Sequence, residues 1–297
     1  MRATEPTEPT GLNETNETND PNELPDLPDG LGLVVADMDG TLLDADGRVP
    51  DGLWPLLDRL AALGAAFAPA SGRQYATLRR LFDRAAEGMV FIAENGSYVV
   101  RDGVEISSTT LDRDVVHGAV ADVRRLVAET GRDAGTVVCG KRSAYVERSD
   151  AAFLAEVDRY YAARTVVDDL DAVDDDVVKV AVFSSDAAES VAEALAHLRA
   201  THQVVVSGRS WVDVMAAGVD KGAAVKRLQA ELGVGRHQTV AFGDYLNDLE
   251  MLDAAAGSFA MADAHPEVAR RAAYRAGSHA EEGVLRVLEA LLERLER

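Results

Sequence analysis

Two aspartates, Asp37 and Asp39, stand two residues apart after the apolar run 31–36. Carboxylates that close repel each other unless a cation lies between them or one holds a proton. The pairing suits one aspartate as a nucleophile that forms an aspartyl-phosphate and the other as a proton carrier. Gly40 follows and lets the backbone turn tightly beside a ligand. Aspartate and glycine are also ordinary turn residues, so the motif alone is equally consistent with an acidic turn.

Two other polar groups follow apolar runs of strand length. Ser71 comes directly after residues 65–70, and Asp244 closely follows residues 238–242. In an open parallel sheet, ligands bind outside the carboxyl ends of the strands, so we expect these groups to lie near Asp37. A serine followed by free backbone N–H groups is a ready anion site. A plain helix N-cap is the commoner role of such a serine.

Lysine is rare in this chain, which contains only four, and Lys221 begins a predicted helix just before the strand at 238–242. The carboxylates offer oxygen ligands to Mg²⁺, which prefers oxygen ligands, few carboxylates and substrate phosphate. Phosphoryl transfer needs such groups to position the phosphoryl oxygens and neutralise their charge. We therefore predict a site for phosphoryl transfer.

The elements that must position these groups follow an alternating pattern. Residues 31–106 alternate strand-length apolar runs with segments of helical periodicity, and residues 216–297 resume the same pattern. This alternation predicts an α/β fold with a doubly wound, mostly parallel, Rossmann-like sheet. The predicted strands lie at 31–36, 65–70, 89–93, 238–242 and 258–261, and the predicted helices at 51–63, 74–87, 221–232, 249–255 and 281–296.

Between the two halves, residues 107–215 have a different pattern, in which strands are joined as hairpins and helices are interspersed. We expect an inserted α+β domain with an open sheet. Its predicted helices lie at about 112–130, 150–162 and 187–200, and its strands at 135–139, 143–147, 177–183, 203–207 and 211–215.

Composition limits the classes of protein to which the chain can belong. It has 297 residues and a net charge of −21, which disfavours nucleic-acid binding. No apolar run reaches about 18 residues, so we expect no membrane span. Cys139 is the single cysteine and the N-terminus is acidic, so we expect a cytoplasmic protein without disulfides. Residues 1–30 are rich in Thr, Glu, Asn, Pro and Asp and predict a disordered acidic tail.

The acidic, lysine-poor composition resembles that of proteins from salt-adapted archaea, in which salt screens the repulsion between surface charges. A G+C-rich genome that encodes Ala, Asp and Arg often is the alternative. We favour the halophilic interpretation.

The order and spacing of the polar motifs resemble the haloacid dehalogenase (HAD) superfamily of phosphohydrolases, over about residues 31–293. The long insert, preceded by Glu94-Asn95-Gly96, is similar to the Cof-type group with a type IIB cap. The matching motifs are Asp37-Met38-Asp39-Gly40-Thr41, Ser71, Lys221 and Gly243-Asp244-x-x-Asn247-Asp248.

The resemblance implies a Mg²⁺-dependent phosphatase that acts on a small phosphorylated metabolite. Asp37 would attack the phosphorus, and Asp39 would protonate the leaving oxygen and then deprotonate water. Lys221 would neutralise the charge on Asp37 and the phosphoryl group. The resemblance also implies substrate contacts from Thr41, Ser71, Gly72, Arg73 and Asn247, and metal ligands from Asp37, Asp39 through its carbonyl, Asp244 and Asp248.

Several alternatives remain open at this stage. A phosphomutase of the same superfamily, a phosphate-receiving signalling domain and an inactive binding module share parts of the pattern. Sugar phosphates, phosphoglycolate, nucleotides and pyridoxal phosphate all remain possible substrates, and the sequence does not predict the oligomeric state. Residues of the insert would select the substrate, but the sequence assigns no ligand group to Arg142, Tyr145, Glu147, Ser207 or Arg209.

Overall fold

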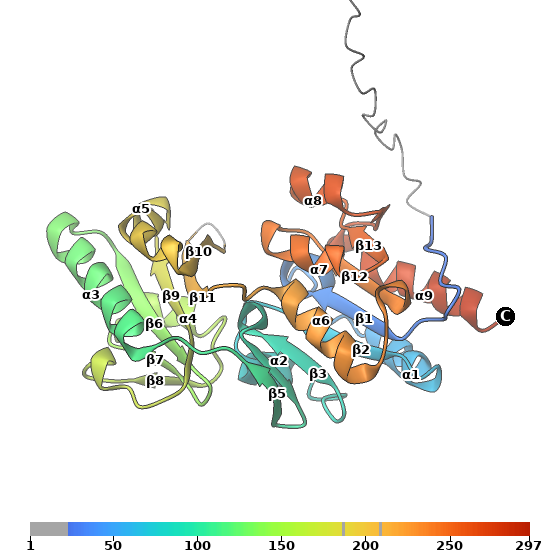
Figure 1. Ribbon diagram of the computed structural model, residues 1–297, viewed down its shortest axis with the longest axis horizontal. Helices are drawn as coiled ribbons and strands as arrows, with labels where there is room; N and C mark the ends of the chain where they lie inside the picture. The colour runs from blue at the N-terminus through green and yellow to red at the C-terminus, as the bar shows by residue number, and fades with distance from the viewer. Residues whose placement is uncertain (1–22, 186–187, 208–209) are drawn as a thin grey trace, which may run out of the picture.

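Two β-sheets lie side by side in the computed structural model, which describes residues 23–185, 188–207 and 210–297 (Figure 1). The first sheet has eight strands in the order β14-β13-β12-β1-β2-β3-β4-β5. Its strands are β1 (Leu33–Asp37), β2 (Ala66–Ala70), β3 (Val90–Ala93), β4 (Tyr98–Arg101), β5 (Val104–Ser108), β12 (Thr239–Gly243), β13 (Gly257–Ala260) and β14 (Tyr274–Arg275).

Strand β1 lies at the middle of this sheet, parallel to β12 on one side and β2 on the other. All neighbours from β14 to β3 are parallel, and β4 and β5 add an antiparallel edge. The predicted mostly parallel, doubly wound sheet is confirmed. Because β1, β2 and β12 are adjacent and parallel, the chain that leaves each of them emerges at the same edge.

Helices cover both faces of the first sheet, which explains why β1 is apolar along its whole length. Val34 and Ala36 pack on one side, and Leu33 and Val35 on the other. The first face is covered by α1 (Leu53–Ala62), α2 (Tyr75–Leu81) and α9 (Gly283–Leu295), and the second by α6 (Lys221–Leu232), α7 (Leu249–Asp253) and α8 (Pro266–Arg271).

The second sheet has six strands in the order β10-β11-β9-β6-β7-β8, all antiparallel except the pair β7–β8. Helices α3 (Arg113–Thr130) and α5 (Ala188–Ala194) pack on one face, whereas α4 (Ala151–Val157) lies on the other. No helix in the described ranges is long and apolar enough to cross a membrane. The strands are β6 (Ala134–Gly140), β7 (Ala144–Val146), β8 (Arg164–Val166), β9 (Val177–Ser184), β10 (His202–Val206) and β11 (Trp211–Ala216).

The helix predicted over 150–162 is shorter in the structure, because α4 ends at Val157 and the short strand β8 follows. The chain after α4 bonds to the first sheet's module instead of continuing the helix. The amide of Ala162 donates to the hydroxyl of Thr77 (2.9 Å), and the side chain of Gln74 bonds both backbone groups of Ala163. These bonds satisfy backbone groups that a helix would otherwise have paired.

The end of the predicted disordered tail also differs from expectation. Residues 1–22 lie outside the described residues, but residues 23–30 pack on the first sheet's module. Leu27 is buried in its core with Leu24 against it, and Arg294 of α9 donates to the carbonyl oxygen of Pro25. The segment is polar on average, so its composition did not indicate that these few apolar side chains are buried. Their burial stabilises an ordered segment.

Candidate active site

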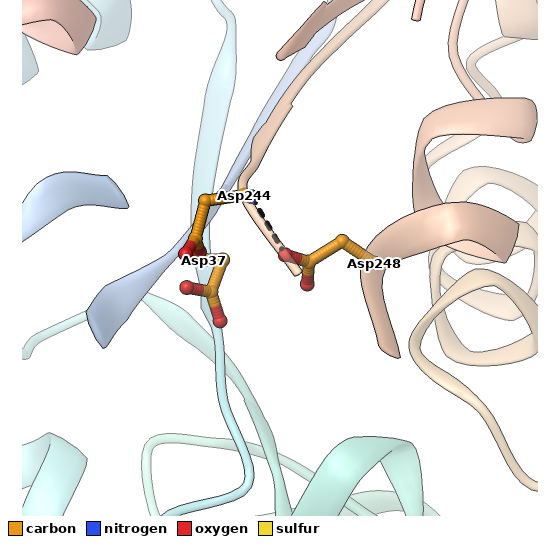
Figure 2. A group of neighbouring side chains, drawn as sticks. All are labelled: Asp37, Asp244 and Asp248. Carbon is orange, nitrogen blue, oxygen red and sulfur yellow. Dashed lines mark hydrogen bonds between the residues drawn. The ribbon is translucent and has the colours of Figure 1, made fainter. Parts of the chain in front are cut away.

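Three carboxylates converge where β1 and β12 end (Figure 2). Asp37 is the last residue of β1, Asp244 follows β12 directly, and Asp248 ends the turn that leads into α7. An oxygen of each lies within 4.8 Å of the others, close enough to share one cation. The strand order therefore brings together residues that are about two hundred positions apart in the sequence.

Lys221 lies between two of these carboxylates and is fully buried. The side chain of Asp220 accepts from the amide of Ala223 (2.6 Å), which caps α6 and fixes Lys221 in its first turn. The ammonium donates to Oδ1 of Asp37 and to Oδ1 of Asp248 (2.7 Å). Lys221 therefore holds the predicted nucleophile from beneath the site.

Both oxygens of Asp248 are engaged by groups of the protein. Oδ1 accepts from Lys221, and Oδ2 accepts from the amides of Asp244 (3.0 Å) and Tyr245 (3.1 Å). The side chain is fully buried. These bonds orient the backbone of Asp244 and leave Asp37 and Asp244 as the carboxylates with more open oxygens.

The electrostatics of the cluster favour a cation. Burial, reinforced by the charge of Asp248, raises the pKa of Asp37 and raises that of Asp244 to about 6. Burial alone would lower the pKa of Lys221, but the charges of Asp248 and Asp37 outweigh it and raise this pKa. Three carboxylates face one lysine, and an all-oxygen donor set with surplus negative charge fits Mg²⁺.

The turn after Asp37 is shaped around Asp244. Gly40 has a φ of +82°, and a Cβ on it would lie 2.5 Å from Oδ2 of Asp244. The next residue, Thr41, donates from its hydroxyl to Oδ1 of Asp244 (3.0 Å) and is buried. The structure thus places the hydroxyl of Thr41 against a candidate metal ligand, and the substrate contact that the resemblance implies for Thr41 stays a prediction.

Asp39 lies two residues after Asp37, and its side chain is about half exposed. Arg73 binds both of its oxygens, with 2.7 Å between Nε and Oδ2. The same guanidinium donates to the carbonyl oxygen of Arg159 (3.0 Å) and lies over the ring of Tyr160. Arg73 therefore connects the predicted proton carrier to the chain that follows α4.

The Ser71–Gly72 turn is supported by a second turn, Glu94-Asn95-Gly96, whose three residues have φ values of +51°, +55° and +95°. The amide of Asn95 donates to the carbonyl oxygen of Ser71 (2.9 Å), and that of Glu94 to the carbonyl oxygen of Arg73 (3.1 Å). Left-handed backbone at non-glycine residues is unfavourable and is concentrated at functional sites. It holds the predicted phosphate-binding turn in place here.

A cavity of about 590 Å³ joins these groups to the second sheet. Every predicted site residue lines it except Thr41, Lys221 and Asp248, which lie buried beneath it. Sequence reasoning did not identify the wall contributed by the second sheet. The one feature of the sequence that could have indicated this wall is Lys179, a lysine inside an apolar strand. The predicted residues in the lining are Asp37, Asp39, Ser71, Gly72, Arg73, Asp244 and Asn247, and the others include Asn95, Tyr160, Tyr161, Lys179, Ser207, Trp211 and Asp213.

Of the polar insert residues considered from the sequence, only Ser207 lines this cavity among those described. Arg142 and Tyr145 both bind Asp175, and Glu147 pairs with an arginine of α3. Arg209 lies outside the described residues.

The chain belongs to the haloacid dehalogenase-like hydrolase family, whose model matches residues 34–288. The predicted superfamily is thereby confirmed. Among named relatives, the Escherichia coli 5-amino-6-(5-phospho-D-ribitylamino)uracil phosphatase YbjI is 33% identical over 88% of this chain and 96% of its own length. The Bacillus subtilis phosphatase YitU, named for the same substrate, is 25% identical over 86% of this chain and 96% of its own.

Solved structures confirm the fold. SMU.1108c of Streptococcus mutans superposes with a TM-score of 0.79 at 24% identity, covering 89% of this chain and all of that one. A protein of Eubacterium rectale superposes with a TM-score of 0.77 at 27% identity, covering 88% of this chain and 98% of that one. With family membership and named phosphatases as relatives, this chain is a phosphatase, and the signalling and inactive alternatives are not supported.

Gly40→Ala should impair the site far more than the same change elsewhere. Gly47 has a similar φ of +72°, but a Cβ added to it would meet nothing within 4 Å, so Gly47→Ala is the control. We expect both variants to lose about 1 kcal/mol of stability through the left-handed backbone. Only Gly40→Ala should also displace Asp244 and lower kcat/KM, by about a hundredfold. Equal activities of the two variants would contradict the role assigned to this turn.

The raised pKa of Asp244 predicts a pH-dependent stability in excess chelator. The folded protein keeps this proton to about pH 6, whereas the ordinary pKa is 3.8, so stability falls as pH rises between these values. Asp244→Asn cannot bind this proton, so it removes the effect. The unfolding free energy of the variant minus that of the parent should therefore rise by about 1–3 kcal/mol from pH 4 to pH 8.

Asp253→Asn is the control with the opposite sign. A hydrogen bond from Arg271 lowers the pKa of Asp253, so this carboxylate stabilises the fold above about pH 4 and loses that contribution in acid. Its substitution should therefore cost more at pH 8 than at pH 3. Urea unfolding across this range measures both variants, and parallel pH trends would contradict the assignment.

Proposed function

We propose that the protein is a Mg²⁺-dependent phosphatase that hydrolyses a small phosphorylated metabolite through an aspartyl-phosphate on Asp37. The observation that carries this proposal is the position of Asp37. It ends the central strand β1, is held by the buried Lys221, faces Asp244, and opens to the cavity. The resemblance of the motifs to those of the family supports the same roles.

In the first half of the reaction, a carboxylate oxygen of Asp37 attacks the phosphorus and the bond from phosphorus to the ester oxygen breaks. Asp39 gives its proton to that oxygen as it leaves. Its half-exposed position on the cavity side of Asp37 supports this role. Ser71 and the amide of Gly72 hold phosphoryl oxygens, and Lys221 offsets the charge that gathers around Asp37.

In the second half, Asp39 takes a proton from water as the water oxygen attacks the phosphorus. The bond from phosphorus to Asp37 breaks, which releases phosphate and restores the carboxylate of Asp37 and the protonated form of Asp39. Arg73, bound to both oxygens of Asp39, would orient this side chain, and one of the two bonds must open whenever Asp39 carries the proton.

Asp37, Asp244 and the carbonyl oxygen of Asp39 would hold Mg²⁺. When bound, the ion would supply positive charge for the phosphoryl oxygens. Asp248 contributes by orientation, because Lys221 and two amides already engage its oxygens. This differs from the direct ligand role that the resemblance left open for Asp248.

The second sheet's module, residues 107–215 as predicted from the sequence, would be a type IIB cap that closes over the substrate and excludes water. The named relatives act on a phosphorylated ribityl-substituted uracil, and a cavity of about 590 Å³ suits a leaving group of comparable size. The acidic, lysine-poor composition and the buried Cys139 support a cytoplasmic enzyme of a salt-adapted organism.

Asp37→Asn should abolish turnover and leave the fold intact. Asparagine keeps the shape of the side chain but is no nucleophile, so kcat should fall by at least about a thousandfold, or about 4 kcal/mol in the barrier. Initial rates with p-nitrophenyl phosphate measure the effect, and circular dichroism checks the fold. Asp51→Asn, at an exposed aspartate, is the control. Residual activity within about tenfold of the parent would exclude Asp37 as the nucleophile.

Activity should require Mg²⁺ and should be inhibited by Ca²⁺. Ca²⁺ takes more ligands at longer distances, so it would misplace the phosphoryl group relative to Asp37. The measurement titrates each ion into chelator-treated enzyme at constant ionic strength. Full activity in excess chelator would show that the carboxylate cluster does not serve a metal.

A further inference from the structure

A second group of charged side chains lines the cavity on the wall opposite the carboxylate cluster. Lys179 of β9 and Asp213 of the adjacent strand β11 both reach into it, although each side chain is less than 5% exposed. They belong to the second sheet, and their nearest partners belong to the first sheet's module. Neither takes part in the reaction steps proposed above.

Lys179 bridges the two modules. Its ammonium donates to the carbonyl oxygen of Gly72 (2.8 Å) and pairs with Oε2 of Glu94 (2.6 Å). Oδ2 of Asp213 lies 3.8 Å from the same nitrogen. An ammonium has three N–H donors, so two are used and the third lies near the carboxylate without a hydrogen bond to it.

Asp213 is also only partly engaged. Its Oδ2 accepts from Nδ2 of Asn95 (3.1 Å), and Asn95 in turn accepts from Asn247 (3.2 Å). Oδ1 of Asp213 has no hydrogen-bond partner in the part of the chain that the structure describes. The cavity wall therefore presents a free donor and a free acceptor side by side.

A hydroxyl group is the natural partner of such a pair, because it accepts one hydrogen bond and donates another. A second anion is a poor partner. Lys179 is matched against two carboxylates, Glu94 and Asp213, so the group carries no surplus positive charge. The rings of Tyr160 and Trp211, 5.5 Å apart, supply apolar surface nearby that can cover a carbon skeleton.

We propose that Lys179 and Asp213 bind a hydroxyl group of the substrate's leaving group, and that they select neutral, polyhydroxylated phosphate monoesters over apolar or anionic ones. This inference rests on the proposed phosphatase function and narrows its substrate class. The two residues are specificity residues that take no part in the proposed bond-making and bond-breaking steps.

The test compares three substrates that share a six-carbon chain. Sorbitol 6-phosphate carries neutral hydroxyls, 6-phosphogluconate adds a carboxylate, and n-hexyl phosphate has no hydroxyl group. The purified parent, Lys179→Met, Asp213→Asn and a control are assayed with Mg²⁺ for kcat/KM on each. The control, Lys141→Met, removes a lysine of the second sheet's module whose partners, Glu105 and Asp176, lie outside the cavity.

The parent should prefer sorbitol 6-phosphate to both others. In Lys179→Met and Asp213→Asn, the ratio of kcat/KM for sorbitol phosphate to that for hexyl phosphate should fall about 10- to 100-fold. Asp213→Asn also removes a negative charge, so 6-phosphogluconate should improve relative to sorbitol phosphate. Lys141→Met should leave both ratios as in the parent. A purely structural role would lower all three activities together and leave the ratios unchanged.

Lys179→Met leaves Glu94 buried without its cation and can fail to fold. Asp213→Asn keeps the shape of the side chain, so its ratios decide the outcome in that case, with thermal unfolding as the check. Unchanged kcat/KM ratios in a folded, active Asp213→Asn variant would overturn the inference. A parent enzyme that hydrolyses p-nitrophenyl phosphate but does not prefer sorbitol phosphate would also overturn it. A parent inactive on all four esters would overturn the proposed function and this inference with it.

Discussion

The bond from Lys221 to Asp37 and Asp248 is the interaction on which the rest of the site depends. A charge with no exposed surface must be paired, because its desolvation is otherwise prohibitive. Lys221 can reach both carboxylates only if α6 begins at its observed place and lies close to α7. Gly222 permits this approach, since a Cβ there would meet the backbone of Glu250 at 2.1 Å. The cap of α6, the packing of α6 on α7 and the orientation of Asp244 are thus parts of one arrangement.

The strand order explains how distant segments form one site. Because β1 lies between β2 and β12, the segments that carry Asp37, Ser71 and Asp244 leave the sheet at neighbouring points. None of these contacts requires the chain between β5 and α6. That chain is free to form another sheet and to supply the opposite wall of the cavity. In the function we propose, the first sheet's module would carry the chemistry and the second would contribute to selectivity, and residues of both line the cavity.

The sequence predicted the carboxylate cluster because each member follows an apolar run or opens a helix, and parallel strands bring such positions together. It did not predict the partners of Lys179 and Asp213, because these depend on how the two sheets lie against each other, which no local pattern encodes. The bond from Thr41 to Asp244 was not predicted for a similar reason, since Asp244 is far away in the sequence. Residues 23–30 are ordered because a few of their apolar side chains are buried. The average composition of this polar segment does not show that.

Arg73 makes one part of the site depend on contacts with the second sheet's module, whereas another part does not. The contacts of Asp37, the proposed nucleophile, with Lys221, which also binds Asp248, lie wholly within the first sheet's module. The surroundings of Asp39, the proposed proton carrier, involve both modules, because Arg73 binds Asp39 and also the carbonyl oxygen of Arg159. Lys179 likewise binds the carbonyl oxygen of Gly72. Separating the two modules would break the contacts that the second sheet's module makes with Arg73 and Gly72 and would leave the contacts of Asp37 intact. In the mechanism we propose, Asp37 would therefore be held in place whether or not the second sheet's module lies over the site, whereas Arg73 and Gly72 would be fixed from both sides only when it does.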